Sequence, residues 1–165
     1  MRIAIREITE LDEARELLPV MEERAAEALA LVREEGLPAG ALAAFLERSF
    51  AAPETTLLLA EADDGSGPAA GTGSGHSGDM RGLLLSGPFT DPLAGDRRPM
   101  ILVLWVERSL RHRGLAGALV KRARELMAER GLAPLAGRAE AGDDARIAMG
   151  ERWGFMRAWE VMVAE

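Results

Sequence analysis

Thiol and imidazole side chains are scarce in this 165-residue chain, which has no cysteine and two histidines. Without thiols there is no disulfide, no thiolate metal site and no cysteine nucleophile. Two histidines also argue against a metal site built on imidazole ligands. We therefore expect chemistry that requires neither a bound metal nor a covalent thiol intermediate.

Long apolar runs are equally lacking. No run approaches the roughly 18 residues that would span a bilayer, and the opening Met1-Arg2-Ile3 does not resemble a signal peptide. A formal net charge of −7 argues against nonspecific nucleic-acid binding and mildly favours cationic ligands. With 48% hydrophobic residues the chain can form a core. These features predict a single cytoplasmic domain over residues 1–165 that binds neither membrane nor nucleic acid.

The most informative stretch runs from Ile101 to Arg130. Its first six residues, as far as Val106, are all apolar, which predicts a strand covered on both faces. An arginine- and glycine-rich turn follows, and then a helical pattern that ends at Gly131. Because the amides at a helix N-terminus have no intrahelical partner and attract anions, this order predicts a phosphate-binding turn. The apolar face of the helix is predicted to contain Leu115, Ala118, Leu119, Ala123 and Leu126.

The remaining helices and strands are predicted from hydrophobic periodicity and from the residues that end helices and strands. Pro19 is expected to separate two helices, and Asp143 with Asp144 is expected to cap a short one. Residues 86–99, with three prolines, are expected to form an irregular turn. The predicted strands are 3–8, 56–60, 80–85, 132–141 and 156–164, and the predicted helices are 11–18, 19–35, 37–50 and 143–152.

Residues 63–79 are rich in glycine, serine, alanine and proline, which predicts a flexible loop between two antiparallel strands. Within it, residues 73–78 match the dinucleotide-binding pattern G-x-G-x-x-G. No strand precedes the pattern directly, and the residues that follow predict a strand and not a helix. We therefore interpret the segment as a connector and not as a nucleotide site.

The turn Arg111-x-x-Gly114-x-Ala116, five residues after Val106, resembles the acyl-CoA signature of the GNAT superfamily of N-acetyltransferases. Near the C-terminus, Asp143 and the pair Gly154-Phe155 also resemble a family motif. The resemblance implies an α/β fold with a mixed, mostly antiparallel central sheet flanked by helices. It implies cofactor contacts at the strand end, in the turn and at the start of the last helix: Leu104, Trp105, Val106, Arg111, His112, Arg113, Gly114, Leu115, Ala116, Gly117 and Asp143.

The resemblance also implies a reaction. An acetyl group would pass from acetyl-CoA to a primary amine of a small molecule or a peptide by direct attack, without a metal. The resemblance is also compatible with a homodimer. His112 could act in catalysis or face solvent beside the phosphates. Trp105 could line the acyl or acceptor pocket or belong to the core.

Two family features are missing. The tyrosine that commonly protonates the departing sulfur is replaced by Gly150, and the chain contains no tyrosine. The central strand also carries no carboxylate that could serve as a general base. Glu140 is the favoured replacement, and Asp96, Glu107 or an ordered water are the alternatives. Because of these departures, the alternative interpretation is that the protein is an acyl-CoA-binding module that has lost catalysis and serves a sensing or structural role.

Overall fold

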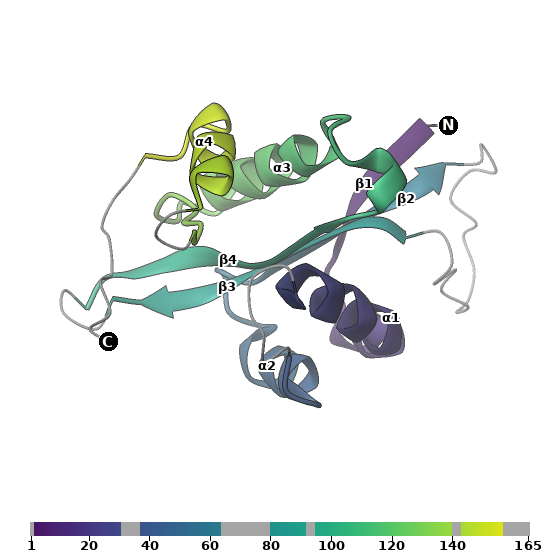
Figure 1. Ribbon diagram of the computed structural model, residues 1–165. Helices are drawn as coiled ribbons and strands as arrows, with labels where there is room; N and C mark the ends of the chain where they lie inside the picture. Colours follow the sequence, from purple (N-terminus) through teal and green to yellow (C-terminus); the bar gives the residue numbers. More distant parts are fainter. Residues whose placement is uncertain (1, 31–36, 64–79, 92–94, 140–142, 157–165) are drawn as a thin grey trace, which may run out of the picture.

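The computed structural model describes residues 2–30, 37–63, 80–91, 95–139 and 143–156. In this part of the chain, four antiparallel strands form a sheet in the order β1-β2-β3-β4 (Figure 1). The strands are β1 (Arg2–Ile8), β2 (Thr56–Asp63), β3 (Met80–Thr90) and β4 (Arg97–Val106). The helices are α1 (Leu11–Ala30), α2 (Ala41–Ser49), α3 (Leu115–Glu129) and α4 (Asp144–Arg152), with a 3₁₀ turn η2 (Arg108–Leu110).

Helices cover both faces of the sheet, with α1 and α2 on one side and α3 and α4 on the other (Figure 1). Leu57 and Leu59 of β2 belong to the core on the α1 side, whereas Leu58 belongs to the core on the α3 side. Successive side chains of a strand point to opposite faces, so an unbroken apolar run fits a strand covered on both sides. This arrangement is the expected α/β fold with a central, mostly antiparallel sheet.

Helix α1 is continuous, and the predicted break at Pro19 is wrong. Pro19 lies inside the helix with an exposed side chain. A helix-interior proline costs about 3 kcal/mol because it removes one hydrogen bond and crowds the preceding turn. Four apolar side chains at helical spacing are nonetheless buried on both sides of the proline, and their packing against the sheet outweighs that cost. They are Ala14, Leu17, Met21 and Ala25.

Strands β3 and β4 are longer than expected, so the predicted irregular turn over 86–99 is wrong. Strand β3 continues to Thr90 and β4 already begins at Arg97, with Pro88 directly opposite Pro99. A register shift lies between Leu85 and Ser86. Prolines are tolerated in strands near such irregularities because their missing N–H is not needed there.

The predicted strand over 132–141 is also wrong for its described part. Only an isolated parallel bridge joins Ala136 to Met100 of β4, through Ile101 N donating to Ala136 O at 2.9 Å and Ala136 N donating to Pro99 O at 2.8 Å. The segment has too few apolar side chains to pair further. The expected final strand (156–164) and most of the glycine-rich loop lie outside the described residues.

Helix α3 follows the turn, as predicted, and begins at Leu115, but its apolar face differs slightly from the expected one. Ala118 is exposed, whereas Val120 and Met127 are buried together with Leu119, Ala123 and Leu126. Gly131 follows the helix with φ +65°, the left-handed conformation typical of a helix end. No helix in the described part of the chain is long and apolar enough to cross a membrane.

Candidate functional site

Gly114 begins the turn-to-helix junction that the sequence predicts to bind an anion. It is the N-cap of α3 with φ +87°, and a Cβ added there would meet nothing within 4 Å. The first hydrogen bond of α3 joins Ala118 N to Gly114 O at 3.0 Å. The amides of Leu115, Ala116 and Gly117 therefore precede the helical ladder and are available to an anion that approaches over Gly114.

The three basic residues of the turn lie in different surroundings. His112, with φ +62°, and Arg113 are exposed and have no ion pair in the described part of the protein. Arg111 instead turns back toward the sheet, where its Nε donates to Val106 O at 3.0 Å and its Nη2 contacts Glu27 Oε1 at 3.0 Å. Arg111 therefore ties the turn to the end of β4 and to α1.

The outer edge of β4 offers unpaired backbone groups beside this turn. Glu107 N donates to Arg81 O at 2.9 Å, and residues of an antiparallel ladder alternate between paired and outward-facing peptide groups. The register then directs the N–H and C=O of Leu104 and Val106 away from β3. Because Val106 O already accepts from Arg111 Nε, the free edge is formed by the peptide groups of Leu104. Beyond the bridge at Ala136, no described strand covers Leu104.

Trp105 lies on the other face of β4. Its side chain is 4% exposed, and its Nε1 donates to Glu27 Oε2 at 2.8 Å. The guanidinium of Arg24 stacks 4.8 Å from the centre of its ring. Trp105 therefore belongs to the core under α1, and it also lines a cavity. That it lines the acyl or acceptor pocket stays a prediction.

That cavity, here called the Trp105 cavity, opens between α1 and the adjoining ends of β3 and β4. Its volume is about 270 Å³. Its walls carry three arginines, two glutamates, a methionine and the tryptophan: Arg24, Arg81, Arg108, Glu27, Glu107, Met80 and Trp105. The sequence analysis did not single out Glu27 as a site residue. A buried indole N–H needs an acceptor, but the sequence does not tell which glutamate supplies it.

Helix α4 packs against the start of α3. A Cβ on Gly117 would lie 3.1 Å from Trp153 Nε1, so the glycine makes room for that ring. Arg124 of α3 donates to Trp153 O at 2.6 Å. Asp143 caps α4, as predicted, by accepting a hydrogen bond from Arg146 N at 3.0 Å. Gly150, at the position of the missing tyrosine, would place a Cβ 3.8 Å from that of Phe155, an ordinary contact distance.

The candidate general bases are not equivalent. Glu107 accepts hydrogen bonds from Arg81 at 2.6 Å and from Ser109 at 2.8 Å. These bonds lower the pKa of the Glu107 carboxyl and make it a weaker base. Asp96 precedes β4, so the whole strand, about 30 Å at ~3.3 Å per residue, separates it from the turn. Glu140 lies outside the described residues.

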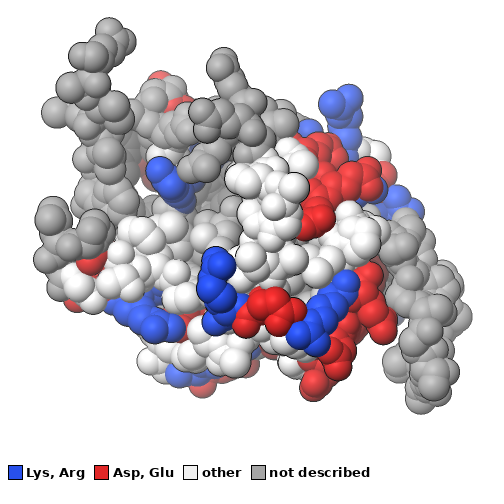
Figure 2. All heavy atoms as spheres, turned by 90° about the horizontal axis from the view of Figure 1, so that it is seen from below, with Lys and Arg blue, Asp and Glu red and all other residues white. Residues whose placement is uncertain are grey.

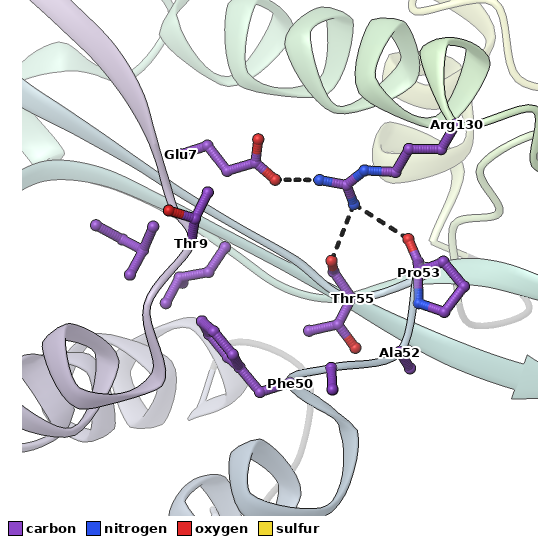
Figure 3. Close-up of a pocket in the computed structure, with 10 residues that line it drawn as sticks. Glu7, Thr9, Phe50, Ala52, Pro53, Thr55 and Arg130 are labelled. Carbon is purple, nitrogen blue, oxygen red and sulfur yellow. Dashed lines mark hydrogen bonds and ion pairs between the residues drawn. The ribbon is translucent and has the colours of Figure 1, made fainter.

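A second cavity, of about 210 Å³, lies where β1 and the α2–β2 connection meet the end of α3 (Figure 3). Arg130 occupies it and donates to Pro53 O and Thr55 O, each at 3.1 Å, and to Thr56 Oγ1 at 2.8 Å. It also pairs with Glu7 (Figure 3). Because the guanidinium already has four partners, we assign this cluster a structural role. The cluster lies at the end of α3, and the turn at residues 111–117, here called the anion turn, lies at the other end of that helix.

Several solved structures that are similar to this chain are acetyltransferases. AAC(6')-Iy in complex with the bisubstrate analog CoA-S-monomethyl-acetylneamine is similar with a TM-score of 0.67 and 18% identity, over 100% of this chain and 98% of the other. A ribosomal-protein-alanine N-acetyltransferase from Brucella melitensis biovar Abortus 2308 gives 0.63 and 19%, over 100% and 98%. A glucosamine-6-phosphate N-acetyltransferase from Arabidopsis thaliana gives 0.60 and 12%, over 100% and 99%.

No curated protein matches the sequence significantly. The model of the acetyltransferase (GNAT) family, however, matches residues 22–155, which include the C-terminal part of α1, the whole of β4, the turn at residues 111–117 and α4. The strand, the turn opened by Gly114 and the helix that follows lie inside this match. The chain therefore belongs to the acetyltransferase (GNAT) family.

Proposed function

We propose that this protein transfers an acetyl group from acetyl-CoA to a primary amine of a small molecule or a peptide. The observation that carries the proposal is the unobstructed N-terminus of α3 over Gly114, next to the free edge of β4 at Leu104. The amides of residues 115–117 suit the pyrophosphate of CoA, exposed Arg113 adds positive charge beside it, and exposed His112 adds a hydrogen-bonding ring. The outward peptide groups of Leu104 suit the amides of the pantetheine arm.

The reaction is a direct transfer. The neutral amine nitrogen attacks the thioester carbonyl, a C–N bond forms, and the C–S bond breaks so that the sulfur leaves with the electron pair. The nitrogen then gives up its extra proton, which the thiolate takes directly or through water, so that the products are a neutral amide and a free thiol. A thiol pKa near ~8.5 makes the thiolate a fair leaving group, so the missing tyrosine slows this step without preventing it. The ammonium proton must be removed first, and Glu140 or a water remains the proposed acceptor.

A binding module without catalysis is the second candidate. It is favoured by Gly150 at the tyrosine position and by the absence of a carboxylate on β4. Such a protein would bind acetyl-CoA through the same turn and would release no thiol in the presence of amines.

The test combines thiol release with CoA binding. Acetyl-CoA and a panel of primary amines should yield free thiol, and a binding module would yield none with any amine. In calorimetry, Gly114→Glu should weaken CoA binding at least about tenfold because it adds bulk and negative charge at the anion turn. Gly40→Glu is the matched control, since Gly40 is also a left-handed helix N-cap (φ +71°) with nothing within 4 Å. Equal CoA affinity in both variants would contradict the placement.

A further inference from the structure

The Trp105 cavity lies on the face of the sheet covered by α1, next to the candidate CoA edge. Trp105 follows Leu104 in β4, so a molecule held in the cavity lies beside the free edge of that strand. Figure 2 views the molecule from the side of α1 and α2 and shows basic and acidic side chains close together there. The individual pairings determine which charges remain available to a ligand.

The groups that would recognise an ammonium are already occupied. The ring of Trp105 carries the guanidinium of Arg24, so its cation-binding face is taken. One oxygen of Glu27 accepts from the indole N–H and the other from Arg111. A cationic ligand would have to displace one of these partners.

Glu107 is occupied in the same way. Its two oxygens accept from Arg81 Nη1 at 2.6 Å and from Ser109 Oγ at 2.8 Å. Each carboxylate of the cavity therefore has an arginine partner. Each of the four carboxylate oxygens of Glu27 and Glu107 thus already accepts a hydrogen bond.

Hydrogen-bond donors, in contrast, are in surplus. A guanidinium carries five N–H donors, and three guanidiniums line this cavity. The Nε atoms of Arg24 and Arg81 are buried and have no hydrogen-bond partner in the described part of the protein. Arg108 is exposed and forms no ion pair there. Planar guanidinium groups bind carboxylates and phosphates through paired hydrogen bonds, so the donors that exposed Arg108 leaves unpaired match an oxyanion.

We propose that the Trp105 cavity binds the anionic group, a carboxylate or a phosphate, of the amine that is acetylated. This inference rests on the proposed acetyl transfer and names its substrate class. The acceptor is a small amine that carries a negative charge, and polycationic amines are poor substrates. The arginines of the cavity thus favour an anionic ligand, whereas the net charge of the whole chain, −7, would by itself favour a cationic one.

The experiment compares matched amines that differ in the anionic group. O-phosphoethanolamine is paired with ethanolamine, and β-alanine with β-alaninamide, and kcat/KM is measured by thiol release. In at least one pair, we expect kcat/KM to be at least about tenfold higher for the anionic amine than for the neutral one. This is the effect expected from one hydrogen bond to a charged group. The two pairs decide between phosphate and carboxylate.

Variants then locate the preference. Arg108→Glu should reduce the anionic-to-neutral ratio at least about tenfold, and Arg108→Lys should reduce it less, because lysine keeps the positive charge and loses only the paired hydrogen bonds. Arg48→Glu is the control, since Arg48 is exposed on α2 outside the cavity. It should leave the ratio unchanged.

Two kinetic results would overturn the inference: a ratio near or below one in both pairs, or a ratio that Arg108→Glu leaves unchanged. If no amine releases thiol, the proposed function fails, and the cavity is then tested by calorimetry of O-phosphoethanolamine and β-alanine with the CoA-bound protein. Binding of either one that Arg108→Glu abolishes and Arg48→Glu retains supports the anion site. Absence of binding by both refutes it.

Discussion

Glu54 and Glu47 each accept two hydrogen bonds from one arginine, but only Glu54 is buried. Arg97 contacts Glu54 at 2.6 and 3.0 Å, and Arg15 contacts Glu47 at 2.8 and 2.9 Å. The side chain of Glu54 is 8% exposed, whereas that of Glu47 is 49% exposed. Exposed ion pairs contribute little to stability, so Glu54 should matter more than Glu47.

The pH dependence of stability follows from the direction in which the pKa of Glu54 is shifted. The hydrogen bond from Arg97 lowers the pKa of the Glu54 carboxyl in the folded protein. Its stabilisation is therefore present above the unfolded pKa of about 4.3 and is lost as the pH falls through the folded value. Glu54→Gln should lower Tm by a few degrees at pH 7, and the difference from wild type should shrink below about pH 4.

The control for this prediction is Glu47→Gln. It should change Tm less than Glu54→Gln at pH 7, although Arg15 also lowers the pKa of Glu47. Thermal unfolding followed by circular dichroism at several pH values provides the measurement. Equal effects of the two substitutions at pH 7 would show that burial does not distinguish the pairs.

At the scale of single elements, α1 holds a proline in its interior without a break. Replacing exposed Pro19 by alanine restores a backbone hydrogen bond and relieves crowding in the preceding turn. Part of the gain is offset because proline also restricts the unfolded chain. We expect Pro19→Ala to raise the free energy of unfolding by about 1–2 kcal/mol, measured by urea denaturation.

Pro38→Ala is the matched control, because Pro38 is exposed and precedes α2. It should change stability by less than Pro19→Ala. A loss of stability in Pro19→Ala would instead mean that the proline is needed where it stands, for example to shape the helix against the sheet.

At the scale of the whole molecule, the long connection between β2 and β3 is a candidate for removal. Glu61 lies directly opposite Met80 in the ladder, so the two strand ends are neighbours and a short turn could join them. We propose that residues 64–79 act only as a connector. Replacing Gly65 to Gly78 by a short turn should then leave Tm and CoA affinity unchanged, because loop length has a small entropic effect.

Calorimetry with CoA and a thermal melt of the shortened protein test this proposal. A large loss of CoA affinity with a preserved Tm would mean that the G-x-G-x-x-G pattern at 73–78 takes part in binding. A loss of both would indicate that the segment supports the fold.

The local features of this protein were determined by the sequence itself. The apolar run before Val106, the turn over Gly114 and the helix from Leu115 were predicted in the right order, because each depends on residues that are neighbours in the chain. The cap by Asp143 is local in the same sense, since it spans three residues. The family resemblance rests on these short-range features, and the family match confirms it.

Only the tertiary structure decided what the long-range partners are. Trp105 and Arg111 both meet Glu27, over sequence separations of 78 and 84 residues, and no local pattern selects that glutamate among those of α1. Arg111 lies in the predicted phosphate turn, and its side chain reaches back to the end of β4 and to α1. Burial against the sheet likewise kept α1 continuous through Pro19, because packing energies summed over many residues exceed the preference of a single one.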